Sequence, residues 1–149
     1  MIVLLLFKPG PLRDGLNALL STIPDVQLVV HAHDVRAVLE FCQKNPNTLI
    51  IMVIKSGDRA LIGSIPEIKL LNPQMPMIAL LQNEDDREVA EKAGIDLILS
   101  IGTPVQELKS KIEYMVRNSP TIETFEKKRW LGEIVTDWEK ERRELNLKE

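Results

Sequence analysis

The chain has 149 residues, of which 44% are hydrophobic and 28% are charged, and its formal net charge is −3. This composition is typical of a folded domain with a sizeable core and excludes a disordered chain. The negative net charge argues against nucleic acid as a partner, because phosphate binding usually needs a basic face.

The first residues, MIVLLLF, are apolar, but Lys8 ends the run. A signal peptide needs a basic start and a longer apolar region, and a membrane helix needs about 20 apolar residues. We therefore expect a buried first strand and no membrane association. The chain has one cysteine, Cys42, which allows no internal disulfide and suits a reducing cytoplasm.

Five apolar runs predict strands, and helical patterns separate them. The third run lacks the alternation of a half-exposed strand, which indicates a strand covered on both faces. The predicted strands are Ile2–Phe7, Val26–Val30, Leu49–Ile54, Met77–Leu81 and Leu97–Ile101.

The first two helices are predicted from apolar spacing. The first has an apolar face of Leu12, Leu16, Leu19, Leu20 and Ile23, and it stops before Pro24. The second has Val35, Val38, Leu39 and Cys42 at helical spacing, so Cys42 is expected to pack in the core. No His or Asp stands at helical spacing to activate its thiol as a nucleophile.

The last three helices are predicted from their capping signals. A third helix lies somewhere in 60–71. Its start is left open, because Ser64 to Glu67 has the form of a capping box, which would place Pro66 in the first turn. Asn83 can cap the fourth. For the fifth, Thr103 is the expected N-cap, Pro104 the first residue and Gln106 the partner in the box; its inward positions are Val105, Leu108, Ile112 and Met115.

Five alternating strands and helices through residue 117 predict an α/β domain with helices on both faces of a parallel sheet. We expect a flavodoxin-like three-layer sandwich of strand order 2-1-3-4-5, with a crevice beyond the carboxyl ends of strands 1 and 3. His31 and His33 would share one face of the second strand as a possible metal pair. No third ligand is evident, so we predict no metal site.

The composition changes after residue 117, and 118–149 is predicted to be a separate C-terminal extension. It holds 8 acidic and 7 basic residues in 32, yet apolar residues recur at helical spacing. This pattern predicts an amphipathic helix with one apolar face. The residues of this face are Trp130, Leu131, Ile134, Val135 and Trp138.

Several stretches in 1–117 resemble receiver domains of two-component response regulators. "PLRDGLNALLSTIPDVQLVVHA" is similar to their first helix and second strand, and "LLNPQMPMIALL" to the end of their third helix and their fourth strand. "DDREVAEKAGIDLILS" followed by "TPVQEL" is similar to their fourth helix, fifth strand and fifth helix. The resemblance lies in the order of these segments rather than in any single motif.

The resemblance implies a phosphorylation site at the carboxyl ends of the strands. Receivers carry an acidic pair there, a phosphoacceptor Asp, a Thr or Ser, and a Lys; together they hold Mg²⁺ and the phosphoryl group. Alignment places these positions, in that order, on Phe7 and Lys8, Met52 (Val53 in a register shifted by one), Leu81 and Ile101. All five have been replaced. Asp58, the nearest loop carboxylate, lies too far along the chain from Met52 to substitute for the acceptor.

The replacements predict a pseudo-receiver, a signal-transduction module that acts by protein–protein interaction, without catalysis, metal or cofactor. Two alternatives remain open: a generic α/β domain, and a flavodoxin-like binder or enzyme that takes a small ligand in the apolar crevice near Lys8. The apolar face of the tail helix must be buried on its own domain, on a second copy in a homodimer, or on a signalling partner.

Overall fold

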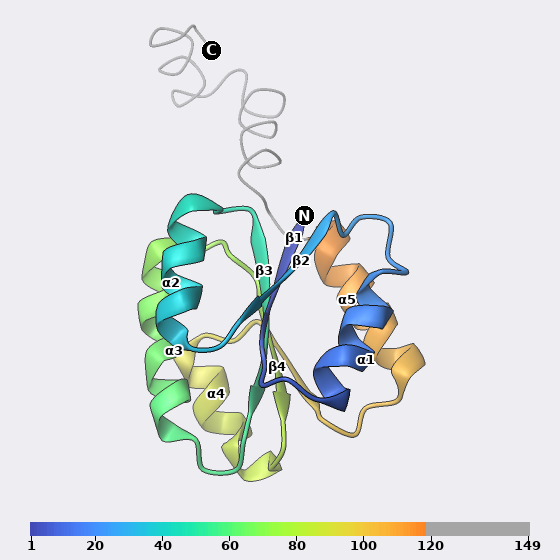
Figure 1. The fold of residues 1–149 in the computed structure, drawn as a ribbon. Helices are drawn as coiled ribbons and strands as arrows, with labels where there is room; N and C mark the ends of the chain where they lie inside the picture. Colours follow the sequence, from blue (N-terminus) through green and yellow to red (C-terminus); the bar gives the residue numbers. More distant parts are fainter. Residues whose placement is uncertain (119–149) are drawn as a thin grey trace, which may run out of the picture. The chain divides into compact units, whose positions relative to one another are not determined.

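The structure is a computed structural model that describes residues 1–118 (Figure 1). Strands and helices alternate throughout, as the apolar runs predict. The predicted tail helix around Trp130 lies outside the described residues. The elements are β1 (Ile2–Leu6), α1 (Pro11–Leu20), β2 (Leu28–Ala32), α2 (Val35–Lys44), β3 (Thr48–Ile54), α3 (Arg59–Leu71), β4 (Met77–Leu81), the 3₁₀ helix η1 (Glu84–Asp86), α4 (Arg87–Ala93), β5 (Leu97–Ser100) and α5 (Val105–Asn118).

The five strands form one parallel sheet in the order β2-β1-β3-β4-β5, which confirms the predicted topology. The central strands β3 and β4 are buried along almost their whole length. The edge strand β2 is largely exposed or half-buried. This difference explains why the central runs are uniformly apolar, whereas β2 includes the exposed His31.

Helices cover both faces of the sheet (Figure 1). On one face α2, α3 and α4 pack on alternate residues of the strands, in a core that includes Leu4, Ile50 and Ala79. On the other face α1 and α5 pack on the residues in between, such as Leu5 and Ile51. No helix in residues 1–118 is long and apolar enough to cross a bilayer.

The second strand and first helix differ from their predicted bounds. Strand β2 begins two residues later than predicted, because the N–H of Val26 donates to the carbonyl of Ile23 in a turn at 3.0 Å. The strand ends at Ala32, so His33 lies just past it and, contrary to the prediction, does not share a strand face with His31. Helix α1 ends at Leu20, so Ile23, predicted on its apolar face, lies in the turn that follows. Leu12, predicted on the same face, is 39% exposed.

Helix α3 begins directly after Asp58, whose Oδ1 accepts from the N–H of Leu61 at 3.1 Å. The predicted capping box at Ser64 is wrong, because the Ser64 hydroxyl lies inside the helix and donates to the carbonyl of Leu61 at 2.6 Å. Pro66 is an interior residue of the helix. It removes one helical N–H donor, yet the helix continues because its inner face is buried. That face consists of Ile62, Ile65 and Ile68.

The structure confirms the cap predicted for the fourth helix but starts the fifth helix at a different residue. Asn83 Oδ1 accepts from the N–H of Asp85 at 2.9 Å, which confirms the fourth cap, although the first turn is 3₁₀. Helix α5 begins at Val105, one residue later than predicted, and the Thr103 hydroxyl donates to the carbonyl of Ser100 at 2.7 Å. Val105 is 64% exposed and does not face inward.

An ion pair fastens α3 to the amino-terminal edge of the sheet. Lys69 Nζ donates to Asp96 Oδ2 at 2.6 Å and to the carbonyl of Met75 at 2.8 Å. The same Asp96 oxygen accepts from the N–H of Met77, at the start of β4, at 2.8 Å. One carboxylate therefore joins a helix, a strand and the turn before β5.

Replacing Asp96 by Ala should lower the free energy of unfolding by about 1–3 kcal/mol, because the Lys69 ammonium and the Met77 N–H both lose a charged acceptor. Glu88→Ala is the matched control. It breaks the pair with Lys92, in which both side chains are 77% exposed, and should change stability by less than about 0.5 kcal/mol. Urea denaturation of both variants measures the difference, and equal losses would contradict this role for Asp96.

Candidate functional site

The five positions aligned with the receiver phosphorylation site do not lie together. Met52 and Leu81 are buried in the core beneath α2, α3 and α4, whereas Phe7 is buried in the core beneath α1 and α5. Ile101 is 38% exposed, and Lys8 is exposed. The four apolar residues therefore do not form one cluster at the carboxyl edge of the sheet; they are Phe7, Met52, Leu81 and Ile101.

Strand register explains the separation. Leu6 of β1 pairs with Met52 of β3, and both belong to the core on the α2 side of the sheet. Successive strand residues point to opposite faces, so the next residues, Phe7 and Val53, belong to the other core. Met52 is fully buried, whereas Val53 is half-buried and lines a cavity. The sequence leaves two residues, Met52 and Val53, open for the position of the receiver acceptor. Only Val53 lies at the rim of the cavity.

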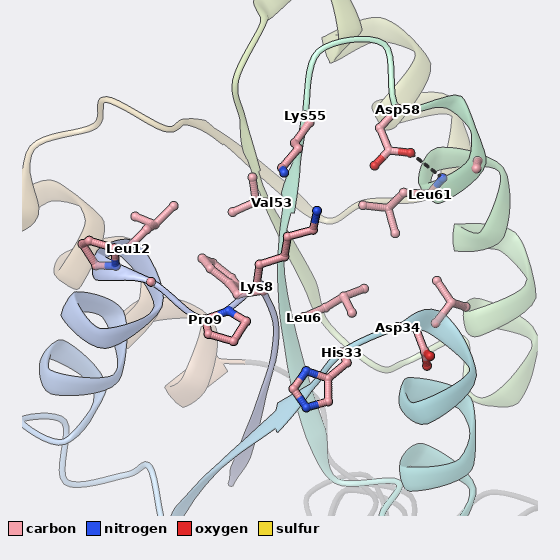
Figure 2. Close-up of a pocket in the computed structure, with 15 residues that line it drawn as sticks. Leu6, Lys8, Pro9, Leu12, His33, Asp34, Val53, Lys55, Asp58 and Leu61 are labelled. Atoms are coloured by element: carbon pink, nitrogen blue, oxygen red, sulfur yellow. Dashed lines mark hydrogen bonds between the residues drawn. The ribbon is translucent and has the colours of Figure 1, made fainter.

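A cavity of about 500 Å³ opens at the carboxyl edge of β1 and β3, within the crevice predicted for this fold (Figure 2). The loops after β1, β2 and β3 form its walls together with the first residues of α1, α2 and α3. Its lining consists of Leu6, Phe7, Lys8, Pro9, Gly10, Pro11, Leu12, His33, Asp34, Val35, Val53, Lys55, Asp58, Ala60 and Leu61.

Both carboxylates of the lining serve as helix caps. Asp34 Oδ1 accepts from the N–H of Ala37 at 2.9 Å in the first turn of α2. Asp58 does the same for Leu61 in α3. Each side chain therefore satisfies a backbone donor and opposes the partial positive charge of a helix N-terminus. Within the described chain, no group of three or more His, Cys, Asp and Glu side chains is arranged to hold a metal ion.

The loop after β3 is fastened to the loop after β4 by three hydrogen bonds. The N–H of Ser56 donates to Gln82 Oε1, and Asn83 Nδ2 donates to Ser56 Oγ, both at 3.1 Å. The N–H of Gly57 donates at 3.1 Å to Oδ2 of Asp86, which is 3% exposed. Gly57 has φ of +71°, a conformation that favours glycine. These bonds hold the rim of the cavity in one conformation.

Cys42 is buried on the inner face of α2, as its spacing predicts. Burial raises the pKa of its thiol to about 11, because the thiolate would lose its hydration. The reactive thiolate is therefore scarce at neutral pH, and Cys42 acts as a core residue. His31 lies outside the cavity, with Nε2 at 3.3 Å from Asn17 Oδ1.

Sequence reasoning named Lys8 as a residue of the crevice but missed Lys55, His33 and Asp34. Lys55 and His33 directly follow a strand end, and Asp34 comes one residue later. Parallel sheets of this kind bind ligands at these strand ends. Their positions after predicted strands were the available signal. The error of two residues in β2 concealed it for His33 and Asp34.

Two solved structures share this fold at low sequence identity. A LuxR family DNA-binding response regulator from Silicibacter pomeroyi matches with a TM-score of 0.65 and 18% identity, over 79% of this chain and 93% of that chain. The Mn²⁺-bound form of response regulator Rcp1 matches with a TM-score of 0.57 and 15% identity, over 80% and 97%. No family model and no curated protein matches the sequence.

The fold is therefore the flavodoxin-like α/β fold of response-regulator receivers. This likeness rests on solved structures of 18% and 15% identity. At these identities it shows the fold alone, so the activity of the chain has to be argued from its own site.

Two matched variants distinguish Met52, in the core, from Val53, at the rim of the cavity. Met52→Asp should lower the free energy of unfolding by about 3 kcal/mol or more, because it removes a buried side chain and buries a carboxylate without a partner. Val53→Asp introduces the same group at the half-buried rim beside Lys8 and Lys55 and should cost clearly less. Thermal and urea unfolding of both variants give the comparison, and a milder effect at Met52 would contradict the register.

Proposed function

We propose that this protein is a receiver-like signalling module that acts through protein–protein contacts without being phosphorylated. The observation that carries the proposal is the replacement of every phosphorylation-site residue in a chain that keeps the receiver fold. Neither Met52 nor Val53, the two candidates for the acceptor position, has a nucleophilic atom. The module is proposed to work in the cytoplasm with a protein partner, and not with nucleic acid or a membrane.

Metal binding at the receiver position is disfavoured by charge and by ligand type. Mg²⁺ needs several oxygen ligands, and receivers supply them from the acidic pair and the acceptor. Here that pair is replaced by Phe7, whose side chain is buried, and by Lys8, whose ammonium would repel a cation. The nearby carboxylates, Asp34 and Asp58, already cap helices.

The hydrogen bonds between the two rim loops support a module that holds its conformation without a phosphoryl group. In receivers, a hydroxyl after the fourth strand binds the phosphoryl oxygens, and here Leu81 occupies that position in the core. The loop that follows is instead fixed to Ser56 and Gly57 by side chains of the chain itself. We therefore propose one resting surface for partner binding, independent of phosphorylation.

A second candidate function is the binding of a small ligand in the crevice. The cavity of about 500 Å³ favours it, because this volume is typical of small-molecule sites and its walls are mostly apolar. The absence of a nucleophile paired with a base among the lining residues argues for binding rather than for catalysis.

Incubation of the full chain with acetyl phosphate and Mg²⁺ should add no phosphoryl group. The reason is that the acceptor carboxylate and the metal ligands are both missing. Intact-mass spectrometry measures the result, with a phosphorylatable receiver treated in parallel to show that the reagent is active. A stable, Mg²⁺-dependent gain of one phosphoryl mass would overturn the proposed function.

The apolar face of 118–149, with Trp130, Leu131, Ile134, Val135 and Trp138, is proposed as an interaction element. Deleting residues 119–149 should convert a homodimer to a monomer. Tryptophan-rich faces carry much of the binding energy of interfaces, and a two-fold interface buries this same face on both copies. Light scattering of both forms measures the mass. If the oligomeric state is the same and only the melting temperature falls, the tail covers its own domain.

A further inference from the structure

Two lysine side chains enter the cavity at the carboxyl edge of the sheet. Lys8 comes from the loop after β1 and Lys55 from the loop after β3, and Figure 2 shows both ammonium groups directed into the space around Val53. Within residues 1–118 the ammonium groups of these two exposed lysines make no hydrogen bond or ion pair. Two like charges without a partner favour a bound counter-ion.

We propose that this cavity binds a small organic monocarboxylate with an apolar body. The inference rests on the proposed function, because a working phosphorylation site would place Mg²⁺ and phosphate at this edge. The carboxylate would lie between the ammonium groups of Lys8 and Lys55, and the apolar body would occupy the rest of the cavity.

The charges of the lining select a single negative charge. Two lysines contribute +2 and Asp34 and Asp58 contribute −2, but each carboxylate caps a helix whose N-terminus carries roughly half a positive charge. The uncapped N-terminus of α1, whose first residues also line the cavity, adds roughly another half, so the sum is between about one and two positive charges. A monoanion leaves a small positive excess, whereas a phosphate dianion would place two negative charges next to two carboxylates.

The remaining lining favours an apolar body. Most of the wall comes from aliphatic, aromatic and proline side chains on the three loops and the helix starts. These residues are Leu6, Phe7, Pro9, Pro11, Leu12, Val35, Val53, Ala60 and Leu61. The volume of about 500 Å³ accommodates a ligand larger than acetate, and burial of its apolar surface adds affinity that a free inorganic anion would lack.

The test is a titration of the full ¹⁵N-labelled chain with 4-phenylbutyrate, followed by two-dimensional NMR. Its uncharged amide, 4-phenylbutyramide, and phenyl phosphate are titrated in parallel. The carboxylate should shift the backbone amide signals of Lys8, Lys55 and Leu61. It should bind about tenfold more tightly than the amide, the scale of one charge-assisted hydrogen bond. Phenyl phosphate should bind more weakly than the carboxylate.

Charge variants identify the binding groups. Lys8→Gln and Lys55→Gln should each weaken carboxylate binding about tenfold and leave amide binding unchanged. Lys44→Gln is the matched control, since Lys44 is exposed at the far end of α2, and it should change neither. Val53→Trp should abolish binding of all three compounds by filling the cavity, and an unchanged circular dichroism spectrum would show that the variant is folded.

Two outcomes would overturn the inference: equal affinity for carboxylate and amide, or shifts confined to residues outside the cavity. Tighter binding of phenyl phosphate would overturn the choice of a monocarboxylate. None of these results bears on phosphorylation, which the acetyl phosphate experiment measures separately. Failure of the ligand site can therefore be told apart from failure of the proposed function.

Discussion

The rest of the structure depends on the parallel pairing of β1 with β3. Because this pair lies inside a sheet covered on both faces, nearly every side chain of the two strands is buried. Strand alternation then divides the residues between two separate cores, with Leu6 and Met52 in one and Phe7 and Val53 in the other. Neither strand contains a charged residue, so charge at the carboxyl edge of this pair is confined to the loops that follow.

That confinement explains the character of the site. The strand ends supply an apolar floor through Phe7 and Val53, and all charge comes from the loops that follow, notably Lys8 and Lys55. The carboxylates that remain, such as Asp58, are used by the backbone as helix caps. The carboxyl edge of this sheet is therefore an apolar cavity that also carries cationic side chains.

The sequence predicts the sheet well because long apolar runs and short connections leave few topologies for a βα chain. It predicts side-chain contacts poorly where one residue of register matters: Met52 and Val53 are both apolar, so periodicity cannot decide which one meets the cavity. It also cannot reveal the pairing of Lys69 with Asp96, which are 27 residues apart. Pro66 lies in the interior of α3 and not in its first turn, because buried isoleucines on the inner face of the helix override local helix rules.

The cavity and the rim loops share one segment, 55–58, and this connection decides how a ligand would affect the surface. Lys55 and Asp58 line the cavity, whereas Ser56 and Gly57 between them bond to the loop after β4. The two outer residues of the segment therefore line the cavity, whereas the two inner residues bond to the next loop, Gly57 through its backbone N–H. A ligand that moves the backbone of this segment would also move the N–H of Gly57. The direction of that N–H is fixed by the left-handed conformation of the residue. The segment is only four residues long, so a displacement of the backbone at Lys55 or Asp58 would strain the bonds of Ser56 and Gly57. Any effect of a ligand in the cavity on the loop before α4 would therefore be transmitted through these four residues.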